Sequence, residues 1–218
     1  MDGTLTESED IWTAALKWMA GELGGQLSTA ARDRMLGRSL GEVVEMLHAE
    51  TASSADTAAT RRALLGKVED IMRRGVPWRP GARELLASVR QAGLQTALVT
   101  SSPRRLVDIT MTSLGHDAFD ITICGDEVRR PKPDPEPYCT AMAMLGLNAD
   151  QCVAIEDSEP GAIAAERAGL PVLVVPSGEP IPAGPARTLA TSLTGQTPYT
   201  LGFLVARHLA CYTVTSVA

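Results

Sequence analysis

Two adjacent carboxylates, Glu156 and Asp157, come directly after the apolar stretch 153–155 and are followed by Ser158. This pattern predicts a strand that ends in a turn, and Pro160 is typical of the first turn of a helix beyond it. Mg²⁺ is a hard cation that takes oxygen ligands in near-octahedral geometry, so paired carboxylates at the end of a strand suit it. The alternative is that Asp157 or Ser158 merely caps the helix and leaves Glu156 exposed.

A run of hydroxyl groups follows a second apolar stretch. Thr100, Ser101 and Ser102 come directly after Leu98 and Val99. Hydroxyls and the backbone amides at the start of a helix bind phosphoryl oxygens, so this stretch is a candidate phosphate site. The alternative is a plain helix cap formed by Ser101 or Ser102.

Lys132 lies in a stretch with three prolines between residues 131 and 135. Each proline fixes its backbone φ angle, so the chain around this lysine is held more firmly than a solvated loop requires. The pattern indicates a positioned cation. The alternative is a basic surface loop, and the neighbouring Arg129 and Arg130 are interpreted as surface charges.

The elements that must position these groups fall into two blocks. Between about residues 10 and 77, helical spacing of apolar residues recurs four times without a strand pattern, which predicts a separate helical unit. From Trp78 onward, helices and short apolar strands alternate, which predicts right-handed crossovers and a parallel sheet covered on both faces. The predicted strands are 94–99, 121–124, 153–155 and 172–175, and residues 177–187 are predicted to form a loop. The polar clusters follow these strands, at the edge where parallel sheets bind ligands.

Composition narrows the class of partner. With 44% hydrophobic and 21% charged residues the chain is typical of a soluble globular protein, and its net charge of -6 disfavours nucleic acid and membrane surfaces. We therefore expect a small-molecule partner. The four cysteines show no metal-ligand spacing and no secretory signal precedes the chain, so we expect mostly buried, reduced thiols and a cytoplasmic location. A monomer is the working expectation, although the sequence does not fix the oligomeric state.

The N-terminal residues Asp2-Gly3-Thr4-Leu5 resemble the second half of the first motif, Asp-x-Asp-Gly-Thr-Leu, of the haloacid dehalogenase-like (HAD) superfamily. The later clusters resemble its second, third and fourth motifs in order, through Thr100, Lys132 and the sequence from Glu156 to Ser158. The resemblance covers about residues 1–176. It implies an α/β fold with a Rossmann-like core formed by residues 1–9 and 78–218, and an inserted helical cap formed by residues 10–77, as in the β-phosphoglucomutase-like subgroup.

The resemblance also assigns roles. In the family, the first Asp of the first motif attacks phosphorus to form an aspartyl phosphate, and the second Asp, matched by Asp2, protonates the leaving group and activates water. Thr100 and Ser101 would bind the phosphoryl group and Lys132 would offset its charge. Asp2, Glu156 and Asp157 would hold Mg²⁺. The nucleophile's position precedes Met1, so we expect the native protein to extend upstream.

The resulting prediction is a magnesium-dependent phosphatase of a small phosphorylated metabolite. Two alternatives stay open: a sugar-phosphate mutase, and a truncated, non-catalytic homologue that binds phosphorylated ligands or a partner. Trp12 stands where the resembling mutases carry a histidine, which disfavours the mutase. Arg38, in a turn between two predicted cap helices, is a candidate substrate contact, with a solvated arginine as the alternative.

Overall fold

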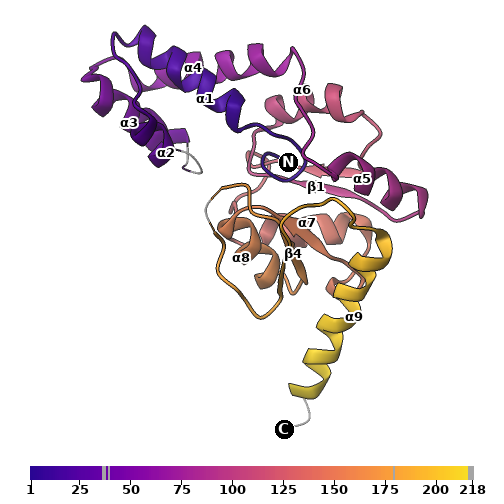
Figure 1. Cartoon of the computed structure of the whole chain (residues 1–218). Helices are drawn as coiled ribbons and strands as arrows, with labels where there is room; N and C mark the ends of the chain where they lie inside the picture. The colour runs from indigo at the N-terminus through magenta and orange to yellow at the C-terminus, as the bar shows by residue number, and fades with distance from the viewer. Residues whose placement is uncertain (36–37, 39, 179, 216–218) are drawn as a thin grey trace. The chain divides into compact units, whose positions relative to one another are not determined.

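The computed structural model describes residues 1–35, 38, 40–178 and 180–215, with side chains up to residue 210. The chain divides into two compact units. A helical unit comprises Ser8–Val76, and a core unit comprises Met1–Glu7 together with Pro77–Ala218 (Figure 1). The division follows the change from helical to alternating patterns along the chain.

The helical unit contains α1 (Glu9–Glu22), α2 (Thr29–Met35), α3 (Leu40–Thr51) and α4 (Thr57–Met72). Asp56 caps α4, because its carboxylate accepts a hydrogen bond of 2.7 Å from the Ala59 amide. The apolar faces meet in a core that includes Leu16, Leu47 and Leu64, all fully buried. The helices therefore form because amphipathic stripes of residues at helical spacing pack against one another.

The core unit alternates helices and short parallel strands, which confirms the predicted α/β class. Its strands are β1 (Ala97–Val99), β2 (Ile121–Ile123), β3 (Ala154–Glu156), β4 (Val172–Val174) and β5 (Arg187–Leu189). Its helices are α5 (Ala82–Gln91), α6 (Arg104–Leu114), α7 (Glu136–Leu145), η1 (Ala149–Gln151), α8 (Glu159–Arg167) and α9 (Pro198–Thr215).

The strands form two sheets rather than the single sheet that the sequence predicted. One sheet pairs β1 with β2, and the other has the order β3-β4-β5, with every pairing parallel. Among the described residues no strand joins β1 to β3. Strand β5 was not predicted, and only its first residue falls in the predicted loop 177–187, but it pairs with β4 along Arg187–Leu189.

The N-terminal segment, Met1–Glu7, contacts both sheets. The carbonyl of Met1 accepts hydrogen bonds from the amides of Thr4, Leu5 and Thr6, so the chain turns back on itself instead of extending as a strand. The Met1 side chain is buried against the side of the β1-β2 sheet that includes Leu98, while Leu5 packs against both hydrophobic clusters. This segment therefore lies where the two sheets meet.

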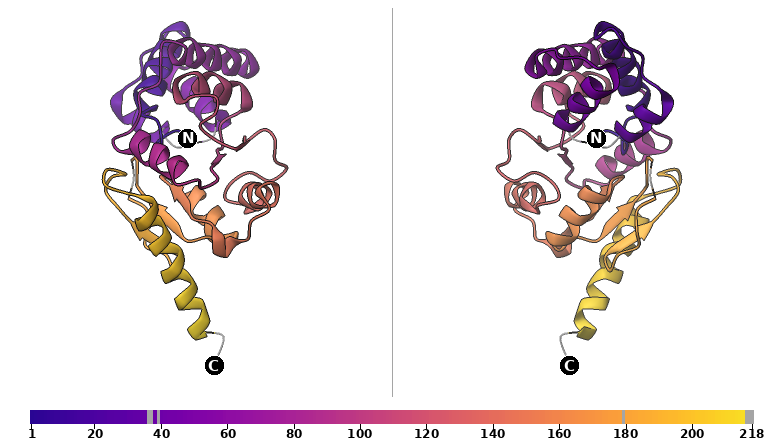
Figure 2. Two further views of the ribbon diagram at one scale, coloured as in Figure 1. Left: turned by 90° about the vertical axis from the view of Figure 1, so that its right-hand side faces the viewer. Right: turned by 90° about the vertical axis from the view of Figure 1, so that its left-hand side faces the viewer.

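Helix α9 packs its Leu201 and Leu204 into the same cluster as Leu173 of β4, and then extends beyond the sheet (Figure 2). Within the described part of the chain, no helix has the length and apolar character needed to cross a membrane. Mostly buried cysteines were predicted, but the described cysteine side chains differ in burial: Cys124 is buried, Cys152 is half-buried and Cys139 is exposed.

Candidate active site

The hydroxyl cluster at the end of β1 contacts the N-terminal segment. Ser102 donates a hydrogen bond of 2.6 Å from its hydroxyl to Oδ2 of Asp2, and its amide donates to the hydroxyl of the buried Thr100 at 3.1 Å. The N-cap residue of α6 is Pro103, which makes no side-chain capping hydrogen bond. The Arg104 amide instead donates to Asp126 at 2.9 Å. The plain helix-cap alternative for this cluster is therefore not what the structure shows.

Ser101 is exposed and its main chain packs tightly on the loop after β2. A Cβ atom at Gly125 would overlap the carbonyl of Ser101, and the Gly125 amide donates to the Ser102 carbonyl at 3.0 Å. The glycine is thus required where the loops after β1 and β2 approach each other. The exposed hydroxyl of Ser101 remains accessible to a ligand.

Asp157 is oriented by two hydroxyl groups from different parts of the chain. Thr4 donates to its Oδ1 at 2.6 Å and Ser177 donates to its Oδ2 at 2.7 Å. The carboxylate lies against the backbone of Gly3, which has a φ of +69°, and a Cβ atom there would overlap the carboxylate. Ser158, not Asp157, caps α8 by accepting from the Gly161 amide.

Glu156 forms a buried cluster with Lys132 and Tyr138. The Lys132 Nζ lies 2.5 Å from Oε1 of Glu156, and these side chains are only 8% and 5% exposed. The Tyr138 hydroxyl donates to the same oxygen, while the Lys132 ammonium lies 4.9 Å from the Tyr138 ring centre. Burial, and secondarily the Glu156 charge, raise the pKa of Tyr138 well above its usual value, so this phenol stays a hydrogen-bond donor. Lys132 is thus not part of a solvated surface loop.

Lys132 also connects the remaining clusters. Its Nζ donates to the carbonyl of Val99 at 3.0 Å, and Val99 directly precedes Thr100 just as Glu156 directly precedes Asp157. The ends of β1 and β3, which belong to different sheets, are therefore connected through the same lysine. The structure thus gathers Asp2, Thr100, Lys132 and Asp157, which lie far apart in the sequence.

Arg38 belongs to the helical unit and does not share these contacts. Its side chain is 58% exposed and its Nη1 lies 3.5 Å from a carboxylate oxygen of Glu42. Of the two arginines interpreted as surface charges, Arg130 is 67% exposed and pairs with Glu136 and Asp134. A substrate role for Arg38 stays a prediction.

The predicted metal ligands are only partly suited to a cation. The Asp157 carboxylate lies against Gly3, which follows Asp2 in the chain, whereas the Glu156 carboxylate accepts hydrogen bonds from Lys132, Tyr138 and Ser158. Over the described ranges, no three His, Cys, Asp or Glu residues are arranged as a metal-binding group. Glu156 in this geometry is the counter-ion of Lys132.

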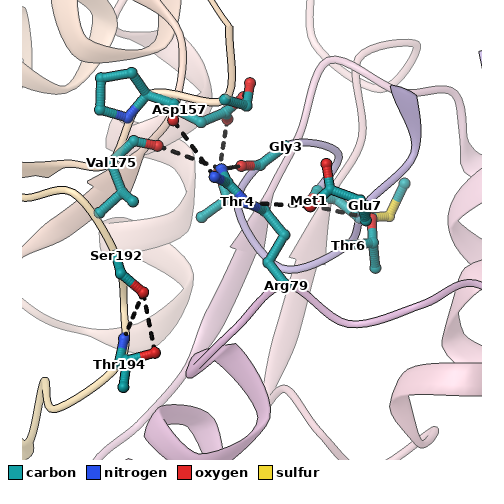
Figure 3. Close-up of polar contacts among 12 residues, drawn as sticks. Met1, Gly3, Thr4, Thr6, Glu7, Arg79, Asp157, Val175, Ser192 and Thr194 are labelled. Carbon is teal, nitrogen blue, oxygen red and sulfur yellow. Dashed lines mark hydrogen bonds and ion pairs between the residues drawn. The ribbon is translucent and has the colours of Figure 1, made fainter. Parts of the chain in front are cut away.

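Three residues that the sequence analysis missed lie in this region: Tyr138, Ser177 and Arg79. Figure 3 shows the Arg79 guanidinium among the carbonyls of Gly3 and Val175. Ser177 follows the end of β4, so the rule applied to the other strand ends would have found it. Tyr138 sits at an ordinary core position of α7, and Arg79 precedes a helix, so neither position carries a local signal of function.

The fold defines an α/β protein with a candidate ligand site near the carboxyl ends of its parallel strands. The chain belongs to the haloacid dehalogenase-like hydrolase family, whose sequence model matches residues 1–175. This confirms the resemblance inferred from the four motifs.

Individual relatives agree with this assignment. Protein CbbY of Rhodobacter capsulatus is 33% identical over 188 residues, covering 81% of this chain and 83% of that protein. Hexitol phosphatase B of Escherichia coli K12 is 29% identical, covering 82% of each chain. A crystal structure of a CbbY mutant from Rhodobacter sphaeroides, in complex with xylulose-1,5-bisphosphate, matches with a TM-score of 0.80 and 25% identity, covering 92% of this chain and 96% of that one.

Proposed function

We propose that this protein is a magnesium-dependent phosphatase that hydrolyses a small phosphorylated metabolite of the sugar-phosphate class. The observation that carries the proposal is the double contact of Lys132, whose ammonium binds both the Val99 carbonyl and Glu156 and so stands between Thr100 and Asp157. A cation, hydroxyls and carboxylates in one place suit a reaction that depends on positioning and charge neutralisation.

Each residue has a role in the proposed reaction. Thr100 and Ser101 donate hydrogen bonds to the phosphoryl oxygens, and Lys132 offsets their negative charge. Asp2, held by the Ser102 hydroxyl at 2.6 Å, protonates the leaving alkoxide and later takes a proton from the attacking water. In the family motif the nucleophilic Asp stands two positions before the Asp that Asp2 matches, and the reaction would proceed through an aspartyl phosphate on that residue.

Mg²⁺ is the proposed cofactor, held by the Asp157 carboxylate and the main-chain carbonyl of Asp2. When bound, it neutralises charge on the phosphoryl group. Glu156 was predicted as a ligand from the sequence. We propose instead that it acts mainly through Lys132, because its oxygens already accept hydrogen bonds from Lys132 and Tyr138.

The names of the relatives favour a phosphatase over a mutase. Hexitol phosphatase B points to a phosphorylated polyol or sugar as the substrate class. The helical unit, inserted between residues 7 and 77, is the proposed cap, with Arg38 as its candidate substrate contact. Trp12 in place of the mutase histidine also disfavours phosphoryl return to a sugar.

The test is a phosphate-release assay with a panel of sugar, polyol and glycolate phosphates, with and without Mg²⁺. It is run on this chain and on a version that carries Asp immediately before Met1. Magnesium-dependent turnover only by the longer version is the expected result. Equal turnover by both versions would contradict a nucleophile at that position, and no turnover by either would favour the non-catalytic phosphate-binding alternative.

A further inference from the structure

We propose that Arg79 is a positioning residue of this site, which fixes the N-terminal segment against the end of β4 and thereby sets the Asp2 and Asp157 carboxylates. The inference rests on the proposed function for its catalytic consequence. Its structural content is independent of that function.

The contacts of Arg79 join three stretches of chain (Figure 3). Its Nη1 donates to the carbonyls of Gly3 and Val175, the latter at 3.4 Å, and its Nη2 donates to the carbonyl of Pro176 at 3.4 Å. Its Nε lies 3.7 Å from Oε2 of Glu7. The side chain is only 15% exposed, so the guanidinium makes these contacts largely out of water.

The main chain of Arg79 also binds the N-terminal segment. Its amide donates to the Leu5 carbonyl at 2.8 Å, and the adjacent Trp78 forms an antiparallel bridge with Thr6. The backbone thus places the base of the arginine beside the N-terminal segment. The guanidinium then reaches across to Val175 and Pro176, which follow β4.

An arginine suits this geometry better than a lysine. A guanidinium presents five N–H groups in a rigid plane, whereas an ammonium is a single point on a flexible stem. Gly3 and Pro176 are in separate stretches, and Arg79 reaches them through different nitrogens. A lysine would have to reach both carbonyls from its single nitrogen, so we expect it to reproduce fewer of these contacts.

Both stretches that Arg79 binds are next to a hydrogen-bond donor of Asp157. Gly3 lies between Asp2 and Thr4, and the Thr4 hydroxyl donates to Oδ1 of Asp157 at 2.6 Å. Pro176 precedes Ser177, whose hydroxyl donates to Oδ2 at 2.7 Å. Displacement of either stretch moves a hydrogen-bond donor of the Asp157 carboxylate. Displacement of Gly3 also moves the adjacent Asp2.

The test compares Arg79→Ala and Arg79→Lys with Arg83→Ala, a control that removes an exposed arginine of α5. In the version of the chain that hydrolyses phosphate esters, we expect kcat to fall by about 10- to 100-fold for both Arg79 variants, because misplacement of about 1 Å has effects of this size. KM should change less than kcat, since Arg79 acts through other residues. Ethylguanidinium should partly restore kcat of Arg79→Ala but not of Arg79→Lys.

Amide hydrogen exchange is the readout that does not need activity. We expect faster exchange in residues 1–7 of Arg79→Ala, with exchange in α7 unchanged and no such effect in Arg83→Ala. If no ester is hydrolysed by the parent protein, the proposed function fails, and exchange alone decides the role of Arg79. Unchanged exchange in residues 1–7, or an equal loss of kcat in Arg83→Ala, would overturn the inference.

Discussion

Lys132 and Glu156 are two opposite charges taken almost entirely out of water. Such a pair gains little net stability, but removal of one partner leaves an uncompensated buried charge. Tyr138 contributes a third polar contact to the same carboxylate oxygen. Glu156 is therefore held in place by Lys132 and Tyr138, whereas its neighbour Asp157 contacts the N-terminal segment.

Glu156→Gln should lower the free energy of unfolding by about 3–5 kcal/mol in the metal-free protein, because the Lys132 ammonium then lacks its counter-ion. Tyr138→Phe should cost about 1–3 kcal/mol, since it removes only a hydrogen bond to a charged group. Urea denaturation without metal measures both, and the Lys132→Met/Glu156→Gln double variant should recover part of the loss. An unchanged free energy of unfolding for Glu156→Gln would refute the counter-ion role.

Gly3 combines a left-handed backbone with close contact to Asp157. Gly3→Ala should therefore destabilise the protein more than Gly93→Ala, which has a similar φ of +72° but no described atom within 4 Å of the added Cβ. We expect about 1–2 kcal/mol for the backbone cost at Gly93 and a larger loss at Gly3. Thermal unfolding of the two variants checks this, and equal losses would show that the contact with Asp157 is unimportant.

At the scale of elements, local patterns predicted the helices of the core unit well. Helix α6 (Arg104–Leu114) and helix α7 (Glu136–Leu145) lie in the intervals between predicted strands, as the alternating pattern indicated. Strand β5 was missed because Arg187–Leu189 is a short, polar stretch after a loop rich in glycine and proline. It becomes a strand only through pairing with β4, a contact that no local pattern contains.

The attachment of β5 depends on an ion pair between Arg187 and Glu166, whose side chains are 7% and 17% exposed and 2.7 Å apart. Arg187→Ala should cost about 3 kcal/mol or more of unfolding free energy, because it leaves the Glu166 carboxylate buried without its partner. Arg130→Ala, which breaks a far more exposed pair with Glu136, should cost at most about 1 kcal/mol. Similar losses in the two variants on chemical denaturation would contradict this reading.

The loop after β2 is tied to α6 by Glu127 and Arg104, whose side chains lie 2.7 Å apart. The hydrogen bond from Arg104 lowers the pKa of Glu127 from 4.5 to about 2. A lowered pKa stabilises the fold above the unfolded value, so this contribution is present at neutral pH and is lost as the pH falls from about 4.5 to about 2.

Glu127→Gln should therefore be less stable than the parent at pH 7, and the difference should shrink toward zero near the folded pKa. Because both side chains are more than a third exposed, the difference at pH 7 should be at most about 1 kcal/mol. Urea denaturation at a series of pH values measures it. A difference that grows on acidification would have the wrong sign.

At the scale of the whole molecule, the sequence was most informative where chemistry follows a strand. Thr100 and Asp157 were chosen for that reason, whereas Lys132 was chosen for its flanking prolines and Asp2 for its motif. Hydrogen bonds of these residues or of their chain neighbours connect all four in the structure. The single predicted sheet was wrong, because residues 1–7 turn back through hydrogen bonds to the Met1 carbonyl and leave β1 and β3 unjoined over the described chain. The sequence analysis did not find Arg79, because its hydrogen bonds go to backbone carbonyls, which every residue type carries.

The most direct test of the shared phosphate site is the effect of Asp2→Asn on magnesium-dependent phosphate release by the version with the upstream Asp. The account predicts a fall in kcat of about 10²- to 10⁴-fold, the usual contribution of a general acid–base group, while the exposed Asp117→Asn control stays within twofold of the parent. Unaltered phosphate release by Asp2→Asn would contradict the central claim.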